Sequence, residues 1–163
     1  MDYIIRLFHP SDGKAVADLL ARNFIEINSK DYPPAQIEKL VAEYTPEKMT
    51  EQATFAHTYI AESDHQIIGT GTICPFWGSM NESIILSLFV LPEFHGKGVG
   101  SALMKQLEKD SFYTRSLRIE VPASKTAKDF YLKLGFQLKN LKNSEEKHGY
   151  IPLEKFLSSP KNP

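Results

Sequence analysis

The chain has few cysteines, little excess charge and no long apolar run, and each shortage excludes a class of protein. Cys74 is the single cysteine in 163 residues, so no disulfide forms within the chain and a bridge-stabilised scaffold is excluded. The net charge is −1, with 19 Lys and Arg against 20 Asp and Glu, which excludes a general affinity for nucleic acid or acidic membranes. No stretch approaches the ~20 apolar residues that span a bilayer.

Other missing signals set expectations about location and metals. Residues 1–8 lack the basic leader, long apolar run and cleavage site of a secretory signal, so we expect a cytoplasmic protein. The five histidines show no spacing typical of metal ligands, so we expect no metal site. Cys74 lies in an apolar segment without a histidine nearby, which favours a buried, unreactive thiol over a nucleophile.

What is present is typical of one folded domain. Apolar residues make up 42% of the chain and charged residues 24%, which is enough to form a core and excludes a wholly disordered chain. The length suits a single core. We predict one domain over residues 1–157 and a disordered tail over residues 158–163.

Helical spacing of apolar residues dominates the first third of the chain, after a short apolar strand over residues 3–8. It predicts three helices before residue 57. Ser11 or Asp12 is expected to cap the first helix and Thr45 the third. Phe55 is expected to face inward from the third helix.

The middle of the chain has the pattern of strands. Residues 57–62 and 67–73 predict a hairpin around a turn at 63–65. Gly69 and Gly71 inside the second strand indicate a bulge or a close approach of another segment. Together these features predict an antiparallel pair whose second strand contains a bulge or is closely approached by another segment.

The most apolar run, residues 83–91, predicts a strand buried on both faces at the centre of a sheet. The remaining pattern predicts a helix from Val99, a strand over residues 116–121, and a helix capped by Ser124 or Thr126 and ended by Gly135. Two closing strands are expected over residues 136–141 and 150–157, around a polar turn at 143–149.

Glycines at alternate positions, Gly96, Gly98 and Gly100, lie between the apolar run and the next helix. Glycine lets the backbone approach a ligand closely, and successive N–H groups at a helix start bind phosphate oxygens. Lys97 adds a positive charge and Ser101 a hydroxyl. The loop therefore predicts a ligand that carries phosphate. The alternative is a glycine-rich turn without a ligand.

Two common phosphate-binding motifs do not fit this loop. A Walker motif requires Ser or Thr after its Gly-Lys pair, and here Gly98 follows Lys97. The dinucleotide fingerprint requires Gly or Ala where this chain has Ser101. Both motifs also usually lie on the first strand of their domain, whereas this loop lies past the middle of the chain.

Two segments resemble the GNAT superfamily of N-acetyltransferases. Residues 88–104 are similar to its acetyl-CoA-binding motif, with His95 where the family usually has Gln or Arg. Residues 124–136 are similar to the family's helix after the fifth strand, which ends in Phe-Tyr, two residues, an apolar residue and Gly-Phe. The order of elements resembles the family over roughly residues 3–157, and residues 32–37 resemble a bacterial subgroup of mostly uncharacterised members.

The resemblance implies a fold and a set of residues around acetyl-CoA. The implied fold is α/β (α+β), with a mixed, mostly antiparallel sheet of six to seven strands and helices on both faces. The backbone of the central strand would pair with the pantetheine arm, and one of its N–H groups would polarise the thioester carbonyl. The N–H groups of residues 96–101 would hold the pyrophosphate. The implied coenzyme-binding residues are Leu88, Phe89, Val90, His95, Gly96, Lys97, Gly98, Val99, Gly100, Ser101, Ser124, Ala127, Lys128 and Phe130.

The sequence offers candidates for a general acid and for a general base. Tyr131 occupies the family's general-acid position, and a phenol is protonated at neutral pH. A core aromatic is the alternative interpretation of Tyr131. Glu82 and Glu120 are candidate general bases, directly or through water, although a solvated surface carboxylate is the more common role for such residues.

No motif in the sequence identifies the substrate that would accept the acetyl group. Tyr32, Tyr44, Phe76 and Trp77 are candidates for its pocket, or for the core. The resemblance implies transfer of an acetyl group from acetyl-CoA directly to a primary amine of a small molecule, peptide or protein. A non-catalytic acetyl-CoA-binding or sensing module on the same fold is the alternative, and an unrelated nucleotide-binding domain is disfavoured. A homodimer paired through edge strands is also compatible with the sequence, with no nucleic-acid, membrane or metal partner expected.

Overall fold

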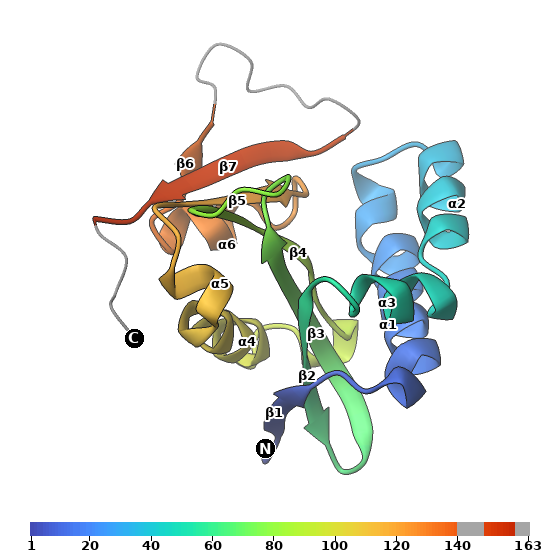
Figure 1. Ribbon diagram of the computed structural model, residues 1–163. Helices are drawn as coiled ribbons and strands as arrows, with labels where there is room; N and C mark the ends of the chain where they lie inside the picture. Colours follow the sequence, from blue (N-terminus) through green and yellow to red (C-terminus); the bar gives the residue numbers. More distant parts are fainter. Residues whose placement is uncertain (140–148, 159–163) are drawn as a thin grey trace.

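A mixed sheet crosses the middle of the protein in the order β1-β2-β3-β4-β5-β7-β6 (Figure 1). This computed structural model describes residues 1–139 and 149–158. Among the described strands, β4 and β5 form the one parallel pair, and all other neighbours are antiparallel. The strands are β1 (Ile4–Leu7), β2 (His57–Ser63), β3 (Gln66–Pro75), β4 (Glu82–Val90), β5 (Arg118–Ala123), β6 (Gln137–Leu138) and β7 (Ile151–Phe156).

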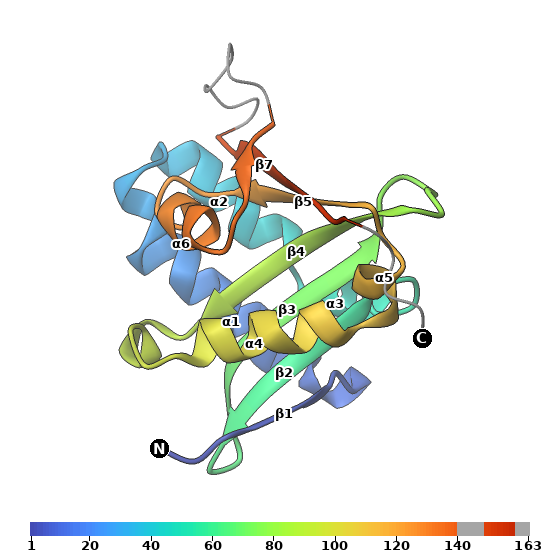
Figure 2. The ribbon, with the colours of Figure 1, turned by 90° about the vertical axis from the view of Figure 1, so that its left-hand side faces the viewer.

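Helices cover both faces of this sheet. The N-terminal three lie on one face, and the later three lie on the other (Figures 1 and 2). The α-helices are α1 (Gly13–Glu26), α2 (Pro34–Glu43), α3 (Pro46–Gln52), α4 (Val99–Lys109), α5 (Ser111–Thr114) and α6 (Lys128–Lys133). Short 3₁₀ turns are η1 (Pro10–Asp12), η2 (Asn28–Lys30) and η3 (Pro92–Phe94). The predicted fold class is confirmed. No helix in the described ranges combines the length and apolar character needed to cross a membrane.

The predicted caps of the N-terminal helices are partly confirmed. Thr45 Oγ1 accepts a hydrogen bond from the Lys48 N–H at 3.2 Å, as a helix cap does. The expected cap at Ser11 or Asp12 is wrong, because the His9 side chain caps the preceding 3₁₀ turn and Asp12 makes no side-chain cap for α1. The Asp12 carboxylate instead accepts from the His9 N–H at 2.7 Å, which completes a capping box at the 3₁₀ turn, and from Arg6 at 2.8 Å and 3.0 Å.

The inward placement of Phe55 is also wrong. Its side chain is 58% exposed, because α3 already ends at Gln52 and the following turn points the ring outward. The helical spacing that predicted burial therefore does not extend to residue 55. Met49, inside the helix, is buried as its spacing predicts.

The β2–β3 hairpin is confirmed, including its turn and its glycines. Asp64 and His65 have φ values of 49° and 62°, the left-handed conformation that tight hairpin turns require. A Cβ added to Gly69 would lie 2.9 Å from Leu103 of α4, and one on Gly71 would lie 2.9 Å from Leu88. Both glycines thus allow the close approach that the sequence indicated.

Strand β4 lies at the centre of the sheet as predicted, but it contains an irregularity. Its register with β3 shifts between Thr70 and Thr72, which oppose Phe89 and Leu86. β4 therefore has one residue more than β3 over this interval, and Ser87 has a φ of 54°. This is a β-bulge. It changes which residues of β4 face α4.

The predicted burial of β4 on both faces is wrong for its second half. β4 pairs with β5 only over Glu82–Ile84, opposite Arg118–Glu120. Beyond that point the two strands run apart (Figure 2), and residues 86–90 of β4 are half-buried. The apolar sequence of this half therefore lines an opening.

The strand predicted over residues 116–121 begins later and continues to Ala123, because a short helix, α5, precedes it. Both faces of this strand are covered, because Ile119 is fully buried and Glu120, on the opposite face, is only 8% exposed. Gly135 has a φ of 92° and ends the α6 segment as predicted.

The closing strands pair through Gln137–Leu138 and Leu153–Glu154. The rest of the first predicted closing strand and most of the predicted turn, residues 140–148, lie outside the described residues, as do residues 159–163 of the predicted tail.

Candidate functional site

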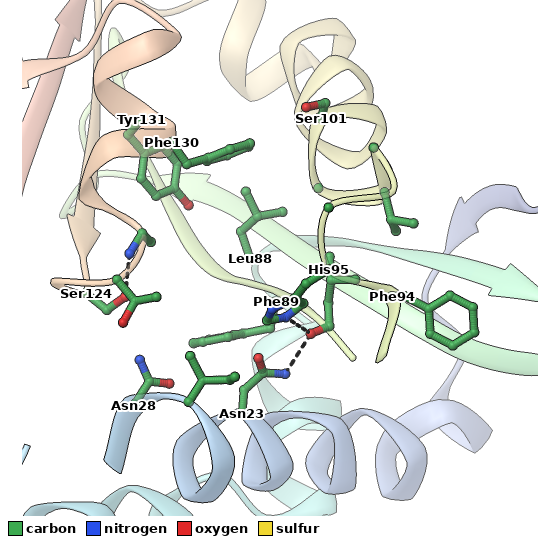
Figure 3. A pocket seen from close by; sticks show the side chains of 18 residues that line it. Asn23, Asn28, Leu88, Phe89, Phe94, His95, Ser101, Ser124, Phe130 and Tyr131 are labelled. Carbon is green, nitrogen blue, oxygen red and sulfur yellow. Dashed lines mark hydrogen bonds between the residues drawn. The ribbon is translucent and has the colours of Figure 1, made fainter. Parts of the chain in front are cut away.

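A cavity of about 360 Å³ lies where β4 and β5 run apart. Its walls come from β4, the glycine loop, the start of α4, the β5–α6 segment and the end of α1 (Figure 3). The lining residues are Asn23, Ile27, Asn28, Leu88, Phe89, Val90, Phe94, His95, Gly96, Gly98, Val99, Gly100, Ser101, Ser124, Thr126, Ala127, Phe130 and Tyr131. Most of the residues predicted to surround a coenzyme thus come together in one place.

The floor of the cavity is the second half of β4. Leu88 packs beside Leu107 of α4, since both would contact a Cβ on Gly71. Phe89 faces the other way and meets the Phe24 ring edge-on, with 5.5 Å between centroids. Beyond Ile84 no described strand pairs with the β5-facing edge of β4. The backbone groups on this edge are therefore accessible to an extended ligand, which can pair with them as a strand would.

One backbone group on this edge is already engaged. The Val90 carbonyl oxygen accepts hydrogen bonds from His95 Nε2 at 2.7 Å and from Asn23 Nδ2 at 2.9 Å (Figure 3). Because a carbonyl can only accept, His95 carries its proton on Nε2. His95 therefore ties the loop to the end of β4, and this proton is not directed at a ligand.

The glycine loop leads into an uncapped helix. Gly96 and Gly98 have φ values of 73° and 82°, and a Cβ on either would meet no atom within 4 Å. The N-cap residue of α4 is Gly98, which has no side chain. The first N–H groups of the helix therefore receive no hydrogen bond acceptor from the N-cap residue. This arrangement suits the oxygens of a pyrophosphate, which those N–H groups and the positive helix end would bind.

Two predicted coenzyme contacts do not line the cavity. The Lys97 ammonium lies 5.5 Å from the centroid of the Phe94 ring on the exposed side of the loop. Lys128, at the start of α6, is half-buried and is likewise not among the lining residues. Both remain close in sequence to residues that do line it.

The wall opposite the loop comes from the β5–α6 segment. Ser124 Oγ accepts from the Ala127 N–H at 3.1 Å, so of the two predicted caps Ser124 is the one that bonds to the turn before α6. Thr126 instead donates to Asp31 Oδ2 at 2.6 Å, which links this segment to the chain after α1. Phe130 lies 3.8 Å from where a Cβ of Gly100 would be, and so it borders the glycine loop.

Tyr131 is both a core aromatic and a cavity residue. It is 4% exposed and meets the rings of Phe130 and Phe136 edge-on, at 5.2 Å and 5.6 Å between centroids. Its hydroxyl points into the space between α6 and β4 (Figure 3). Burial raises the pKa of Tyr131 above its ordinary value, so the phenol keeps its proton in alkaline solution.

Glu82 and Glu120 lie at the other end of the β4–β5 seam, outside the cavity. Arg118 donates to Glu82 at 2.9 Å and to Glu120 at 2.8 Å, and it also reaches Glu154 at 3.2 Å. Lys139 contacts Glu120 at 2.7 Å. The surface interpretation of Glu120 is therefore wrong: it is buried beside Arg118 on the same face of β5 and opposite Glu154 of β7.

The aromatic residues suggested for an acceptor pocket do not line this cavity. Trp77 is 86% exposed in the β3–β4 turn. Phe76 lies under Arg118, with 4.8 Å from the guanidinium carbon to the ring centroid. Tyr32 is buried, and its ring lies 6.4 Å from that of Tyr150. Tyr44 packs against Phe24.

Cys74 is buried, which raises its thiol pKa, and so it has the environment expected of an unreactive thiol. Within residues 1–139 and 149–158 no three His, Cys, Asp or Glu side chains form a group that could hold a metal.

The sequence patterns did not indicate that α1 and the chain after it contribute to the cavity. Asn23 of α1 lines it, as do Ile27 and Asn28 just after the helix. Phe94 and Thr126 are further lining residues that were not predicted. The place of Asn23 could have been predicted from the sequence, because a polar residue seven positions after Val16 lies on the apolar stripe of the helix. The place of Asn28 could not, since it follows the end of the helix and belongs to no periodic pattern.

The chain is similar in sequence or in fold to N-acetyltransferases from several microorganisms. The chain is 31% identical over 133 residues to the uncharacterised N-acetyltransferase YafP of Escherichia coli K12, covering 82% of this chain and 80% of that protein. Its fold is similar to that of PaiA N-acetyltransferase from Thermoplasma acidophilum, crystallised with coenzyme A, with a TM-score of 0.82, 19% identity and coverage of 96% and 100%. A GCN5-related N-acetyltransferase from Rhodopseudomonas palustris gives a TM-score of 0.77 at 22% identity, over 96% and 97% of the two chains.

The structural likenesses concern the fold, and the family assignment rests on sequence. Residues 54–138 match the model of the acetyltransferase (GNAT) domain. That range runs from the β2–β3 hairpin to β6 and so includes the floor, the glycine loop and the α6 wall of the cavity. The chain belongs to the GNAT acetyltransferase family.

Proposed function

We propose that this protein transfers the acetyl group of acetyl-CoA directly to a primary amine of a small molecule, peptide or protein. One observation carries the proposal: a single cavity connects the uncapped start of α4 to the hydroxyl of Tyr131. The first end suits a pyrophosphate and the second a departing thiolate. An elongated ligand with a phosphate end and a thioester end fits both.

The coenzyme would lie along β4. The N–H groups of residues 96–101 bind the pyrophosphate, with Lys97 and Lys128 supplying positive charge from the rims. The pantetheine arm pairs with the open edge of Leu88–Val90 and packs against Phe130 and Ala127. Ser124 borders the arm from the other side.

The transfer itself needs three groups. The amine nitrogen attacks the thioester carbonyl carbon, the carbon–sulfur bond breaks, and the sulfur takes a proton from Tyr131. An N–H of β4 stabilises the negative charge on the carbonyl oxygen during attack. The raised pKa of Tyr131 keeps it in the protonated, donating form.

The amine must also lose a proton. Glu120 and Glu82 are the candidate bases, and because neither lines the cavity, the proton reaches them through water. Arg118 holds both carboxylates, and Glu120 sits at the last paired position before the strands part. Of the two, Glu120 is thus nearer the opening along the seam.

A second candidate function has one observation in its favour. No carboxylate is among the cavity-lining residues that the structure describes, and the one lining histidine has its Nε2 proton engaged by Val90. A coenzyme-binding module without catalysis would have the same cavity and would not need a base.

Thiol release from acetyl-CoA across a panel of amines tests the first function, with thermal shift in acetyl-CoA, CoA, ATP and NAD alongside. We expect stabilisation by acetyl-CoA and CoA and amine-dependent thiol release. Binding without release for any small-molecule, peptide or protein amine would favour the sensing module. Stabilisation by ATP or NAD but not by CoA would contradict both.

A further inference from the structure

Two asparagines from the α1 side line the cavity, and their hydrogen bonding differs. Asn23 Nδ2 donates to the Leu19 and Val90 carbonyls, at 3.1 Å and 2.9 Å. Asn28 is 5% exposed, and its Oδ1 is buried without a hydrogen-bond partner among the described residues. The other such buried atom in the described chain, Arg115 Nε, belongs to a residue over the Phe112 ring and lies away from the cavity.

The position of Asn28 is held by hydrogen bonds from the residues that follow it, which in turn join it to the β5–α6 segment. Its backbone carbonyl accepts from the N–H groups of Asp31 and Tyr32, at 2.9 Å and 3.1 Å. Asp31 in turn accepts from Thr126 at 2.6 Å, and the Tyr32 hydroxyl accepts from the Lys125 N–H at 3.3 Å. Figure 3 shows the Asn28 side chain pointing from η2 into the cavity, on the side where Ser124 lies. The amide is thus fixed at the cavity wall.

A buried amide oxygen without a partner destabilises the folded protein, because it has lost its hydrogen bonds to water. A ligand N–H that donates to this oxygen would remove that cost. The cavity lining is largely apolar and includes no Asp, Glu, Lys or Arg among the described residues, so it suits an uncharged group better than an ammonium ion. The pantetheine arm of coenzyme A has two uncharged amide N–H groups.

We propose that Asn28 Oδ1 accepts a hydrogen bond from an amide N–H of the pantetheine arm and thereby positions the arm between β4 and α6. This inference rests on the proposed use of acetyl-CoA. It makes Asn28, the first residue of η2 after α1, a coenzyme-binding residue outside the two family-like motifs.

Coenzyme analogues give the sharpest test. Two analogues of CoA, each with one amide N–H replaced by an ester oxygen, are titrated calorimetrically into the wild-type protein and into Asn28→Leu. We expect one analogue to bind the wild type about five- to tenfold more weakly than CoA, and Asn28→Leu to bind both CoA and that analogue equally. The analogue that loses affinity identifies the amide.

The nucleotide half of the coenzyme is the matched ligand control. 3′-Phospho-ADP lacks the arm, and we expect it to bind wild type and Asn28→Leu alike. The ligand-free Asn28→Leu protein should melt at the wild-type temperature or above it, because the substitution removes an unpartnered amide. Ser29→Ala, one residue away on the exposed side, should change neither affinity.

Each other outcome is decisive. Equal loss of affinity for CoA and 3′-phospho-ADP would show that Asn28 acts on the fold, and the inference would be wrong. Unchanged CoA affinity with a raised KM for an amine would assign Asn28 to the acceptor instead. If Asn28→Leu fails to fold, the wild type still tests the inference. Equal affinity of the wild type for CoA and for both ester analogues would overturn the proposed hydrogen bond to Asn28. A wild type that binds no CoA would contradict the proposed function itself.

Discussion

The two halves of the β4–β5 seam have opposite character. In the paired half, Glu82–Ile84 lies beside Arg118–Glu120, and Arg118 forms ion pairs with Glu82 on β4 and with Glu120 on its own strand. In the open half, no strand within residues 1–139 and 149–158 pairs with β4 on that side, and apolar side chains line a cavity. The same strand thus contributes structure at one end and a binding surface at the other, and what separates them is where interstrand pairing stops.

The paired half should be the more sensitive to loss of a single side chain. Replacing Arg118 with Leu leaves Glu120 and Glu154 as buried carboxylates without their guanidinium partner. We expect unfolding free energy to fall by about 3 kcal/mol, measured by urea denaturation. Lys14→Ala breaks an exposed pair with Asp18 and serves as the control, with no measurable change expected. A small loss in Arg118→Leu would mean that water reaches this half as well.

In the open half, the largest expected effect is on catalysis. Tyr131→Phe removes the proposed proton donor and keeps the ring contacts with Phe130 and Phe136. We expect kcat to fall about 100-fold while the Kd for CoA stays unchanged. Steady-state thiol release and calorimetry measure the two. Unchanged turnover would leave Tyr131 as a core aromatic, and weaker CoA binding would indicate a packing defect.

The glycine loop should show a moderate effect on both binding and stability. Gly98→Ala places a Cβ on a residue with a φ of 82°, which costs about 1 kcal/mol in unfolding free energy. Strain there also disturbs the N–H groups at the start of α4, so we expect CoA to bind several-fold more weakly. Gly78→Ala, in the β3–β4 turn with a φ of 76°, is the matched control. It should lose similar stability and no CoA affinity.

The smallest expected effect is on the pH dependence of stability. Burial holds the pKa of Tyr131 above the unfolded value near 10, so the fold favours the neutral phenol. Its contribution is complete below pH ~10 and is lost as pH rises from there toward the folded pKa. Urea unfolding at pH 9 and pH 11 should show a steeper loss for the wild type than for Tyr131→Phe. Identical slopes would mean that the hydroxyl is solvated.

Local patterns predicted most of the fold and one side of the site. The glycine loop, the floor at Leu88–Val90 and the α6 wall follow from residues adjacent in sequence, so motif and periodicity indicate them. Helix caps were predicted less accurately. Thr45 accepts a hydrogen bond as expected, whereas Asp12 pairs with Arg6, which lies on β1. That pairing depends on tertiary placement, which no local pattern contains.

The remaining features depend on register and on contacts between distant segments. Glu120 is buried between Arg118, two residues earlier on the same face of β5, and Glu154, which cross-strand pairing places opposite it. The first neighbour can be read from the sequence, whereas the second depends on the register between β5 and β7. The parting of β4 from β5 has no local signature either, since the apolar run continues through it. Asn28 enters the cavity because residues 31 and 32 bond to the segment after β5.

The bulge at Ser87 determines which residues of β4 face α4. Ile85 before the bulge and Leu88 after it both pack against the apolar cluster that includes Met104 and Leu107 of α4. Residues three apart point to opposite faces in a regular strand, so only the bulge allows this arrangement. Loss of this single residue would exchange the two faces of the strand, turning Phe89 toward α4 and Leu88 toward α1. The cavity would then have the same residues in the wrong orientation. The length of the chain at this point therefore matters more to the binding surface than the identity of the side chain there.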